Sequence, residues 1–436
     1  MEYRYVCIRF VGLLGILCIL LFRLQAVGSE SIQVCKEGCT YQSIQSAIDA
    51  AKMGDEIEIA PGTYRENLII SKAISLAGKP NSDSVIIESL QTGKPVISVS
   101  NANQELGSPP LYLSFQNLYI QGARPTATEG PCGGGSAGLC AGIYLESALQ
   151  NDNVTRTRSW PPFSEVHLKL RNVYVKNNAF SAIQWQGKVH LELLSSELSS
   201  NGHHGVIGYG FGQLLFFDTK IVNNKGDAIH IPNAFDNVNI TVVNSTLSHN
   251  GSRGIQVGNI LSCQYAPEIH GVNISLSHTT IIGNSSDGIL LLSPASLNIS
   301  ATVISENSGV GIYAQLCNDN VDIIQLSVFE SKINKNIEAG LVLANTFGMF
   351  KMGNSIISQN GQKPNRLTIF GVTAGPGVGF FKTKGLKSYL FANRIETNAG
   401  YGIMAGSSEN IVLCLNNIVT ENGFGSYDDA ASKKCQ

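Results

Sequence analysis

The sequence predicts an all-β fold: a right-handed parallel β-helix in which coils of three short strands stack into a rod, with a short N-terminal capping helix. Two observations predict it. An asparagine recurs at a minimum interval of 23 residues, as at Asn178, Asn201 and Asn224. Between these asparagines β-branched and polar residues alternate, which is typical of short strands. A repeat of this length indicates a solenoid, because neighbouring repeats bury each other's apolar faces.

Each repeat consists of an asparagine, three variable residues, a small residue and an aliphatic residue. We expect the asparagine side chains to stack and hydrogen-bond from coil to coil, each at a left-handed turn, and the aliphatic residue to point into the core. Longer intervals indicate loop insertions. The series runs Asn178-Ala182-Ile183, Asn201-Gly205-Val206, Asn224-Ala228-Ile229, Asn250-Gly254-Ile255, Asn284-Gly288-Ile289, Asn307-Gly311-Ile312, Asn336-Gly340-Leu341 and Asn398-Gly402-Ile403.

Leucine-rich repeats are the alternative architecture, because they have a similar period and also stack asparagines. They require leucines at a fixed spacing and a helical or extended segment in each repeat. The segments between the asparagines here show almost no helical periodicity, which favours a solenoid built of strands alone.

The first part of the chain predicts a cap for the solenoid. Ile44, Ala47, Ile48 and Ala51 recur at helical spacing, and Gly54 follows them as a stop signal. Short alternating strands begin directly afterwards. Because the first coil of a stack exposes an apolar cross-section and unpaired backbone groups, we expect a helix over residues 40–54 to cover it.

The N-terminus has the features of an export signal. Arg4 and Arg9 flank the start of an apolar run over residues 11–22, and small residues follow at 26–28. The run is shorter than the roughly 20 apolar residues of a membrane span. We therefore expect residues 1–28 to be a signal peptide, with a retained anchor as the alternative, and the mature chain to have no transmembrane segment. Its expected location is secreted, extracellular or periplasmic.

The mature chain is then a single β-helix domain over residues 29–436. Two glycine- and proline-rich segments break the repeat and are predicted to be loop insertions, at 122–163 and 361–386. Trp185 lies two residues after the aliphatic Ile183, so strand alternation predicts that it points into the core. Trp160 falls in the first of the predicted loops.

Eight cysteines remain after removal of the signal, an even number that suits an oxidising compartment. Cys35 with Cys39 and Cys132 with Cys140 are close enough in sequence to close small loops. The connectivity of Cys263, Cys317, Cys414 and Cys435 stays open. A zinc site is not expected at these cysteines, because no paired CxxC motif or companion histidine spacing is present.

The charge balance gives no sign of a nucleic-acid partner. The chain has 30 basic and 32 acidic residues, a net charge of −2, and its lysines and arginines are scattered. Nucleic-acid-binding proteins instead concentrate basic residues on one surface. The expected partner is a polysaccharide or cell-envelope glycan, and the expected state is a monomer.

Aligning the coils on the asparagine brings charged residues into neighbouring positions, because equivalent positions of adjacent coils are neighbours in space. Four consecutive coils carry a charged or ionisable residue just before the small residue. The candidate catalytic residues are His204, Asp227, Arg253 and Asp287. The residue after each aliphatic residue points outward beside them. The candidate substrate-binding residues at that position are Gln184, His230, Gln256 and Tyr313.

Several chemistries are compatible with this column. Asp227 and Asp287 lie two coils apart, about 9.6 Å in a regular stack, near the carboxylate separation of inverting glycosidases. Arg253 between them could act as the base of a lyase or hold a uronate carboxylate, and the carboxylates could hold Ca²⁺ in a lyase. Otherwise no cofactor or metal is expected. The structural alternative is that opposite charges on adjacent coils pair across strands.

Residues 43–78, read together with the asparagine coils, resemble the right-handed β-helix repeat proteins of the pectin-lyase-like superfamily. The resemblance covers nearly the whole mature chain and implies a polysaccharide partner in a groove outside one parallel sheet. Residues 62–66 are similar to the opening strand motif of pectin methylesterases, and residues 202–205 to the Gly-His-Gly motif of polygalacturonases. The remaining motifs of both enzymes are missing.

Three functions remain on the sequence alone. The first is a secreted or cell-surface protein that binds or organises carbohydrate without an intact known catalytic motif. The second is a polysaccharide lyase or glycoside hydrolase that acts on an acidic polysaccharide. The third is a structural or adhesive surface protein whose rigid rod matters more than any groove.

Overall fold

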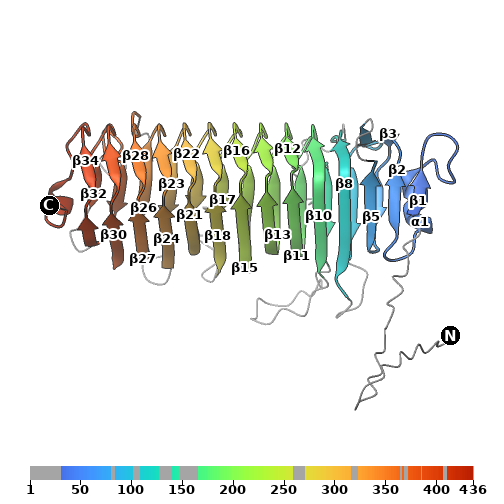
Figure 1. Ribbon diagram of the computed structural model, residues 1–436, viewed down its shortest axis with the longest axis horizontal. Coiled ribbons are helices and arrows are strands. Elements are labelled where there is room, and N and C mark those ends of the chain that lie inside the picture. Colours follow the sequence, from blue (N-terminus) through green and yellow to red (C-terminus); the bar gives the residue numbers. More distant parts are fainter. Residues whose placement is uncertain are drawn as a thin grey trace, which may run out of the picture.

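The protein forms an elongated stack of coils with its two described ends at opposite ends of the rod (Figure 1). The computed structural model describes residues 31–79, 84–101, 109–126, 140–147, 165–258, 271–315, 323–363, 366–367, 372–383, 385–405 and 410–435. Each coil contributes one strand, or part of a strand, to each of three parallel sheets, here named A, B and C. Every strand pairing in these residues joins one coil to the next, and the predicted parallel β-helix is confirmed.

Sheet A contains the strands that follow the small residue of each repeat. It comprises β4 (Leu68–Ile70), β7 (Ile97–Ser100), β9 (Ile143–Glu146), the first parts of β11 (Ile183–Leu194), β13 (Val206–Phe217) and β15 (Ile229–Val243), then β17 (Ile255–Val257), β20 (Ile289–Leu291), β23 (Val310–Gln315), β26 (Ala339–Ala344), β29 (Val378–Phe381) and β32 (Ile403–Ala405).

Sheet B follows sheet A along the chain and has the longer strands. It comprises β1 (Ser31–Val34), β2 (Glu56–Ile59), β5 (Ile74–Gly78), the first parts of β8 (Leu111–Gln121) and β10 (Val166–Lys176), the second parts of β11, β13 and β15, then β18 (Val272–Ser277), β21 (Ala295–Ser300), β24 (Ile323–Phe329), β27 (Phe347–Gly353), β30 (Leu386–Phe391) and β33 (Ile411–Leu415).

Sheet C completes the coil with short strands. It comprises β3 (Gly62–Arg65), β6 (Val85–Glu88), the second parts of β8 and β10, then β12 (Glu197–Ser199), β14 (Lys220–Val222), β16 (Thr246–Ser248), β19 (Thr280–Ile282), β22 (Val303–Ser305), β25 (Lys332–Asn334), β28 (Ile356–Ser358), β31 (Arg394–Glu396) and β34 (Ile418–Thr420).

The predicted asparagine ladder is present at the turn between sheets C and A. Each side-chain amide donates to the side-chain oxygen of the next member at 2.9–3.1 Å, and all members are buried. Asn360 and Asn422 are two members that the sequence analysis did not identify. Among the described residues the ladder contains Asn178, Asn201, Asn224, Asn250, Asn284, Asn307, Asn336, Asn360, Asn398 and Asn422.

The ladder asparagines do not occupy the left-handed position, so that part of the prediction is wrong. The left-handed residue is the one immediately before each of them, for example Ser200 (φ 55°) before Asn201 and Asn223 (φ 58°) before Asn224. The turn from sheet B to sheet C follows the same rule with hydroxyl side chains, as when the Thr219 N–H donates to Ser245 Oγ at 3.0 Å.

The core is a narrow apolar column inside the three sheets. The aliphatic residue of each repeat is fully buried, as predicted, for example Ile183, Ile229 and Ile255. Trp185 also points inward as predicted and has no exposed surface. It fits because the next coil has Gly208 at the paired position, where a Cβ atom would lie only 1.9 Å from the indole ring.

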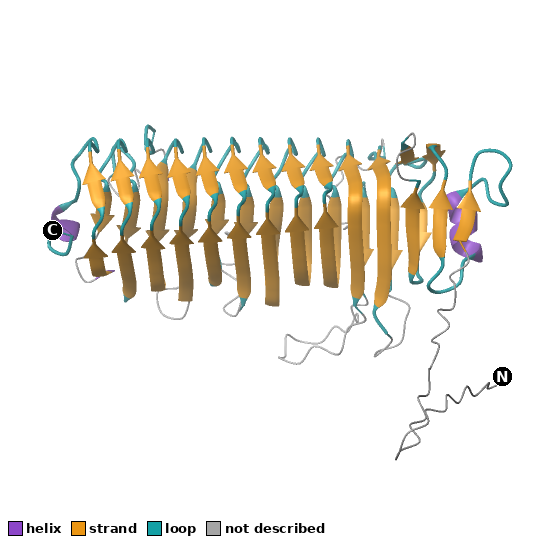
Figure 2. Cartoon of the chain, in the orientation of Figure 1, coloured by secondary structure: helices purple, strands orange, loops and turns teal. Residues whose placement is uncertain are grey.

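A short helix stands at each end of the rod (Figure 2). Helix α1 (Ile44–Ala50) is shorter than the predicted 40–54 and packs against β1, β2 and β4. The Glu66 carboxylate accepts hydrogen bonds from the Ile44 and Gln45 N–H groups and the Ser43 hydroxyl, each at 2.9 Å. Helix α3 (Asp429–Ser432) lies beside β32 at the other end.

Two disulfides are described. Cys35–Cys39 is the pair expected from sequence, and Cys414–Cys435, which the sequence left open, ties the C-terminal helix region to β33. Cys140 is also disulfide-bonded. The other cysteines, Trp160 and the predicted signal peptide lie outside the described residues, in which no helix is long and apolar enough to span a bilayer.

The two segments predicted as loops are shorter than expected. Strand β9 lies within 122–163 and strand β29 lies within 361–386. In both places a glycine and an aliphatic residue, Gly142-Ile143 and Gly377-Val378, continue the repeat. The repeat pattern did not predict these two strands, because no ladder asparagine stands four residues before the glycine.

Candidate functional site

The predicted column lies on the outer edge of sheet A, where strands β11, β13, β15, β17 and β20 begin. The structure brings His204, Asp227, Arg253 and Asp287 together in successive coils. Their backbones are linked in that order, because the residue after each one donates its N–H to the carbonyl of the next, at 2.9–3.2 Å. Residues that are 23, 26 and 34 positions apart are thus direct neighbours.

Asp227 is the centre of this arrangement. Its Oδ2 lies 3.0 Å from His230 Nδ1 and 3.5 Å from His204 Nδ1. Its Oδ1 accepts the Arg253 N–H at 2.8 Å and lies 3.8 Å from the Arg253 guanidinium. Burial alone would raise the pKa of Asp227, but the hydrogen bond from His230 and the neighbouring His204 lower it to about 2. Asp227 is therefore ionised at neutral pH.

His204 supports Asp227 from the preceding coil. It is almost fully buried, and its Nδ1 accepts the backbone N–H of Asp227 at 2.9 Å. Burial lowers the pKa of His204 to about 3, so the ring is neutral at neutral pH. Because Nδ1 accepts, the ring proton belongs on Nε2.

His230 contacts both Asp227 and His204. Its Nδ1 lies near both Asp227 Oδ2 and, at 3.1 Å, His204 Nε2, and it cannot donate and accept at once. The ionised carboxylate is the stronger partner, so we assign the His230 proton to Nδ1, and the 3.1 Å contact with His204 Nε2, which also carries a proton, is then not a hydrogen bond. The lone pair is then on Nε2, which is buried and has no hydrogen-bond partner among the described residues. Gln184 Oε1, two coils away on the same face, is likewise buried and unpartnered there.

Asp287 has a different environment. It has no exposed surface and is enclosed by two arginines, Arg253 (Nε to Oδ2, 3.4 Å) and Arg366 (Nη1 to Oδ2, 3.0 Å), the second of which also contacts Oδ1. The Val310 N–H donates to Oδ1 at 2.8 Å, and Arg366 also donates to Glu338 at 3.0 Å. Burial raises the pKa of Glu338. Arg366 stands at no repeat position and is 79 residues from Asp287, so no pattern in the sequence indicated this contact.

The short segment of Arg366 and Leu367 covers part of sheet A. Leu367 and Val372 join an apolar cluster with Leu290, Tyr313 and Val342 on the outer face of β20, β23 and β26. The Arg366 guanidinium lies 5.3 Å above the Tyr313 ring, and Tyr313 is only 5% exposed. Burial raises the pKa of Tyr313 to about 12. Tyr313 therefore packs beneath this segment, while Gln256, which accepts from Arg253 at 2.7 Å, lies beside the Asp227 cluster.

The chemistry of the column follows from these contacts. Both carboxylates of the proposed acid–base pair, Asp227 and Asp287, are buried and bound to arginine, unlike the two carboxyl groups of a glycosidase. Calcium also does not fit, because it requires six to eight oxygen ligands and the oxygens here face guanidinium groups. His204, Asp227 and His230 do offer ligand atoms within 4.8 Å of one another, although Arg253 adds a positive charge at that point. The arrangement suits hydrogen bonding and proton transfer at His230.

Comparison with known proteins identifies the fold. Residues 181–374 match the family model described as a right-handed beta helix region. Among solved structures, the A-module of mannuronan C-5 epimerase AlgE4 from Azotobacter vinelandii is similar over 88% of this chain and 92% of its own, with 16% identity and a TM-score of 0.56. The surface adhesin PfbA of Streptococcus pneumoniae is similar over 88% of both chains, with 13% identity and a TM-score of 0.40. No curated protein matches the chain in sequence.

Proposed function

The chain has the right-handed parallel β-helix fold of the pectin-lyase-like superfamily, and on this basis we propose that the protein binds a polysaccharide along the outer face of sheet A. One observation carries the proposal: Gln184 Oε1 and His230 Nε2 belong to side chains on the outer face of sheet A, are buried there, and lack hydrogen-bond partners among the described residues. A buried polar atom without a partner costs free energy, and sugar hydroxyl groups can satisfy it. The proposed site comprises His204, Asp227, Arg253 and Asp287 with Gln184, His230 and Gln256.

The repetition of the site suits a repeating ligand. Gln184 and His230 are two coils apart, about 9.6 Å, a distance that a short oligosaccharide spans. Arg253 lies one coil beyond His230, toward the part of sheet A that Arg366 and Leu367 cover. Its side chain keeps 24% of its surface exposed. A guanidinium in that position favours a ligand that carries carboxylates. An acidic polysaccharide is therefore the proposed ligand class, in line with the mannuronan named for one structural neighbour.

Export to an oxidising compartment is part of the same proposal. The disulfides Cys35–Cys39 and Cys414–Cys435 support it, because such bonds persist outside the reducing cytosol. Extracellular or periplasmic polysaccharide would then be accessible to the protein.

Binding can be tested by isothermal titration of the protein with a panel of acidic and neutral polysaccharides. We expect the acidic ones to bind and the double variant Gln184→Ala/His230→Ala to bind about tenfold more weakly or worse, as expected when two hydrogen bonds are lost. Gln213→Ala, an exposed glutamine on sheet B, is the matched control and should bind as the wild type does. Equal affinities of the double variant and the wild type would place the ligand elsewhere.

A second candidate function, a lyase that acts on an acidic polysaccharide, is favoured by the Asp227–His230 contact. Asp227 holds the Nδ1 proton of His230 at 3.0 Å, which leaves Nε2 free to accept a proton. In an elimination, Nε2 would take the proton beside the uronate carboxyl group, the bond to the glycosidic oxygen would break, and a carbon–carbon double bond would form. The leaving oxygen would then take up a proton.

The ultraviolet absorbance of the unsaturated sugar separates the two candidates. If the protein is a lyase, absorbance grows with a polyuronate substrate, and His230→Gln abolishes it while the exposed His249→Gln does not. If binding occurs without any absorbance change in the wild type, the protein is a binding protein and not a lyase.

A further inference from the structure

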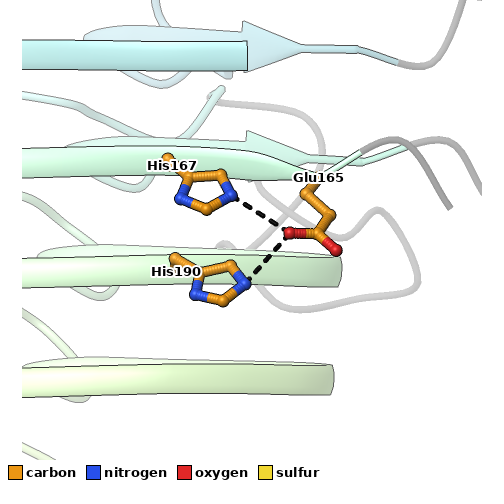
Figure 3. Close-up of side chains that lie close together, drawn as sticks. All are labelled: Glu165, His167 and His190. Atoms are coloured by element: carbon orange, nitrogen blue, oxygen red, sulfur yellow. Dashed lines mark hydrogen bonds and ion pairs between the residues drawn. The ribbon is translucent and has the colours of Figure 1, made fainter. Parts of the chain in front are cut away.

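A second cluster of histidines, drawn in Figure 3, lies on sheet B and not on sheet A, which carries the proposed polysaccharide site. His167 stands on β10 and His190 is its paired residue on β11, one coil further along. Glu165 precedes β10 by one residue and shares the face of His167, because side chains two residues apart point the same way. Three potential ligands therefore project from one point on the surface of the rod.

The side chains converge on a single position. His167 Nε2 and His190 Nε2 each lie 3.1 Å from the same atom, Glu165 Oε2. The two imidazole rings are stacked, with centroids 4.1 Å apart and an interplanar angle of 5°. Both rings turn the same nitrogen toward the carboxylate, as Figure 3 shows.

From this convergence we propose that Glu165, His167 and His190 form a binding site for a divalent transition metal ion, with Zn²⁺ as the ion of choice. Zinc bonds of roughly 2.0–2.1 Å in tetrahedral geometry place neighbouring ligand atoms about 3.3 Å apart, close to the observed 3.1 Å between each nitrogen and Oε2. All three ligand atoms lie within 4.8 Å of one another. Two imidazoles and one carboxylate are ligands that zinc accepts and that calcium and magnesium do not prefer.

The cluster is only partly enclosed by the protein. The side chains are half-buried, with 22–26% of their surface exposed, which leaves an open side for a water molecule or a ligand. Three protein ligands with one open position are also the pattern of zinc sites that bind a fourth group from outside.

Two neighbours hold the ligands in place. Lys188 forms an ion pair with the other carboxylate oxygen, Glu165 Oε1, so Oε2 stays directed at the imidazoles. The exposed Tyr112, one coil before His167, packs against its ring with centroids 4.5 Å apart and an interplanar angle of 37°. Support of this kind around a ligand fixes its orientation. Lys188 also adds a positive charge, which limits the affinity for a cation.

The test is zinc binding by the full chain after treatment with a chelator, followed by isothermal titration and elemental analysis. We expect the wild type to bind Zn²⁺, and His167→Gln, His190→Gln and Glu165→Gln each to weaken binding by more than about tenfold, the lower end of what even indirect ligand support contributes. Affinity should also fall as the pH is lowered, because protons compete for the imidazoles.

Two controls make the result specific. Gln213→Ala changes the residue paired with His190 on the following coil and should leave zinc affinity unchanged. His230→Gln changes the other histidine cluster, and it should also leave the affinity unchanged. The proposal is overturned if the wild type binds no zinc, if the His167 and His190 variants bind it as tightly as the wild type, or if His230→Gln alone removes it.

Discussion

The asparagine ladder and the charged column of sheet A are stacked by the same coil geometry but differ in what each coil contributes. Every described member of the ladder is an asparagine, and each inner member bonds to the asparagines before and after it, as Asn250 does to Asn224 and Asn284. In the column the side chain changes from one coil to the next, from His204 through Asp227 to Arg253. Positions with the same residue in every coil supply hydrogen bonds to the turns of the backbone. Positions whose residue varies determine the charge and hydrogen-bonding groups of one part of the surface.

The largest expected effect is on the ladder. Asn250→Ala removes the acceptor for the Asn224 amide and backbone N–H, and the donor to Asn284 Oδ1 and the Ile221 carbonyl. Because each buried group left without a partner costs about 1–3 kcal/mol, we expect the free energy of unfolding to fall by about 3 kcal/mol or more.

Urea denaturation followed by circular dichroism measures this loss. Asn273→Ala is the matched control, because Asn273 is exposed and donates a single side-chain hydrogen bond to Asn239 at 3.0 Å. If the two variants lose the same free energy of unfolding, a ladder asparagine stabilises the fold no more than a surface asparagine does. The proposed difference between the ladder and the column would then be wrong.

An intermediate effect is expected where the column is covered. Arg366→Met leaves Glu338 buried without its ion pair and removes one of the two arginines on Asp287. Removing one partner of a buried ion pair is strongly destabilising, but the Arg366 side chain is 37% exposed, so we expect a loss of about 2 kcal/mol.

Arg65→Met provides the comparison for that variant. Arg65 also binds a carboxylate, Glu88, at 3.0 Å, but its side chain is 72% exposed. Such surface pairs contribute less than about 1 kcal/mol. Thermal unfolding of both variants should show the larger drop for Arg366→Met, and the opposite order would mean that the covering segment adds little to stability.

The smallest expected effect concerns pH. The pKa of His204 is lowered from 6.5 to about 3 in the folded protein, so the unfolded state binds the extra proton between these values. Stability is therefore present above pH 6.5 and falls as the pH drops toward 3. The expected loss is about 1 kcal/mol over the first pH unit below 6.5.

His204→Gln should remove this part of the pH dependence. Urea midpoints measured between about pH 5.5 and 7, where Asp227 is ionised in both the folded and the unfolded state, compare the variant with the wild type. His249→Gln, at an exposed turn, should keep the wild-type slope. A His204→Gln variant with the wild-type slope would show that this histidine is not buried as a neutral ring.

The features that recur in every coil could be predicted from the sequence. The ladder, the inward aliphatic residues and the adjacency of His204, Asp227 and Arg253 follow from position within the coil. Arg366 could not be predicted, because a loop has no period and its contact with Asp287 depends on tertiary packing. His167 and His190 are also 23 residues apart, but they lie on sheet B, far along the coil from the asparagine used for alignment. Aligning every position of the coil, and not only those after the asparagine, would have revealed them.

The covered ends of the rod have a consequence for its length. Helix α1, capped by Glu66, packs on β1, β2 and β4 at one terminus, and α3, tied to β33 by the Cys414–Cys435 bond, lies beside β32 at the other, so part of each terminal edge is covered. The number of coils between the two helices can vary without changing these covers. The span from Asn284 to Glu306 is a complete module of 23 residues, and duplicating its coding sequence would lengthen the protein by about 4.8 Å while both covers stay intact.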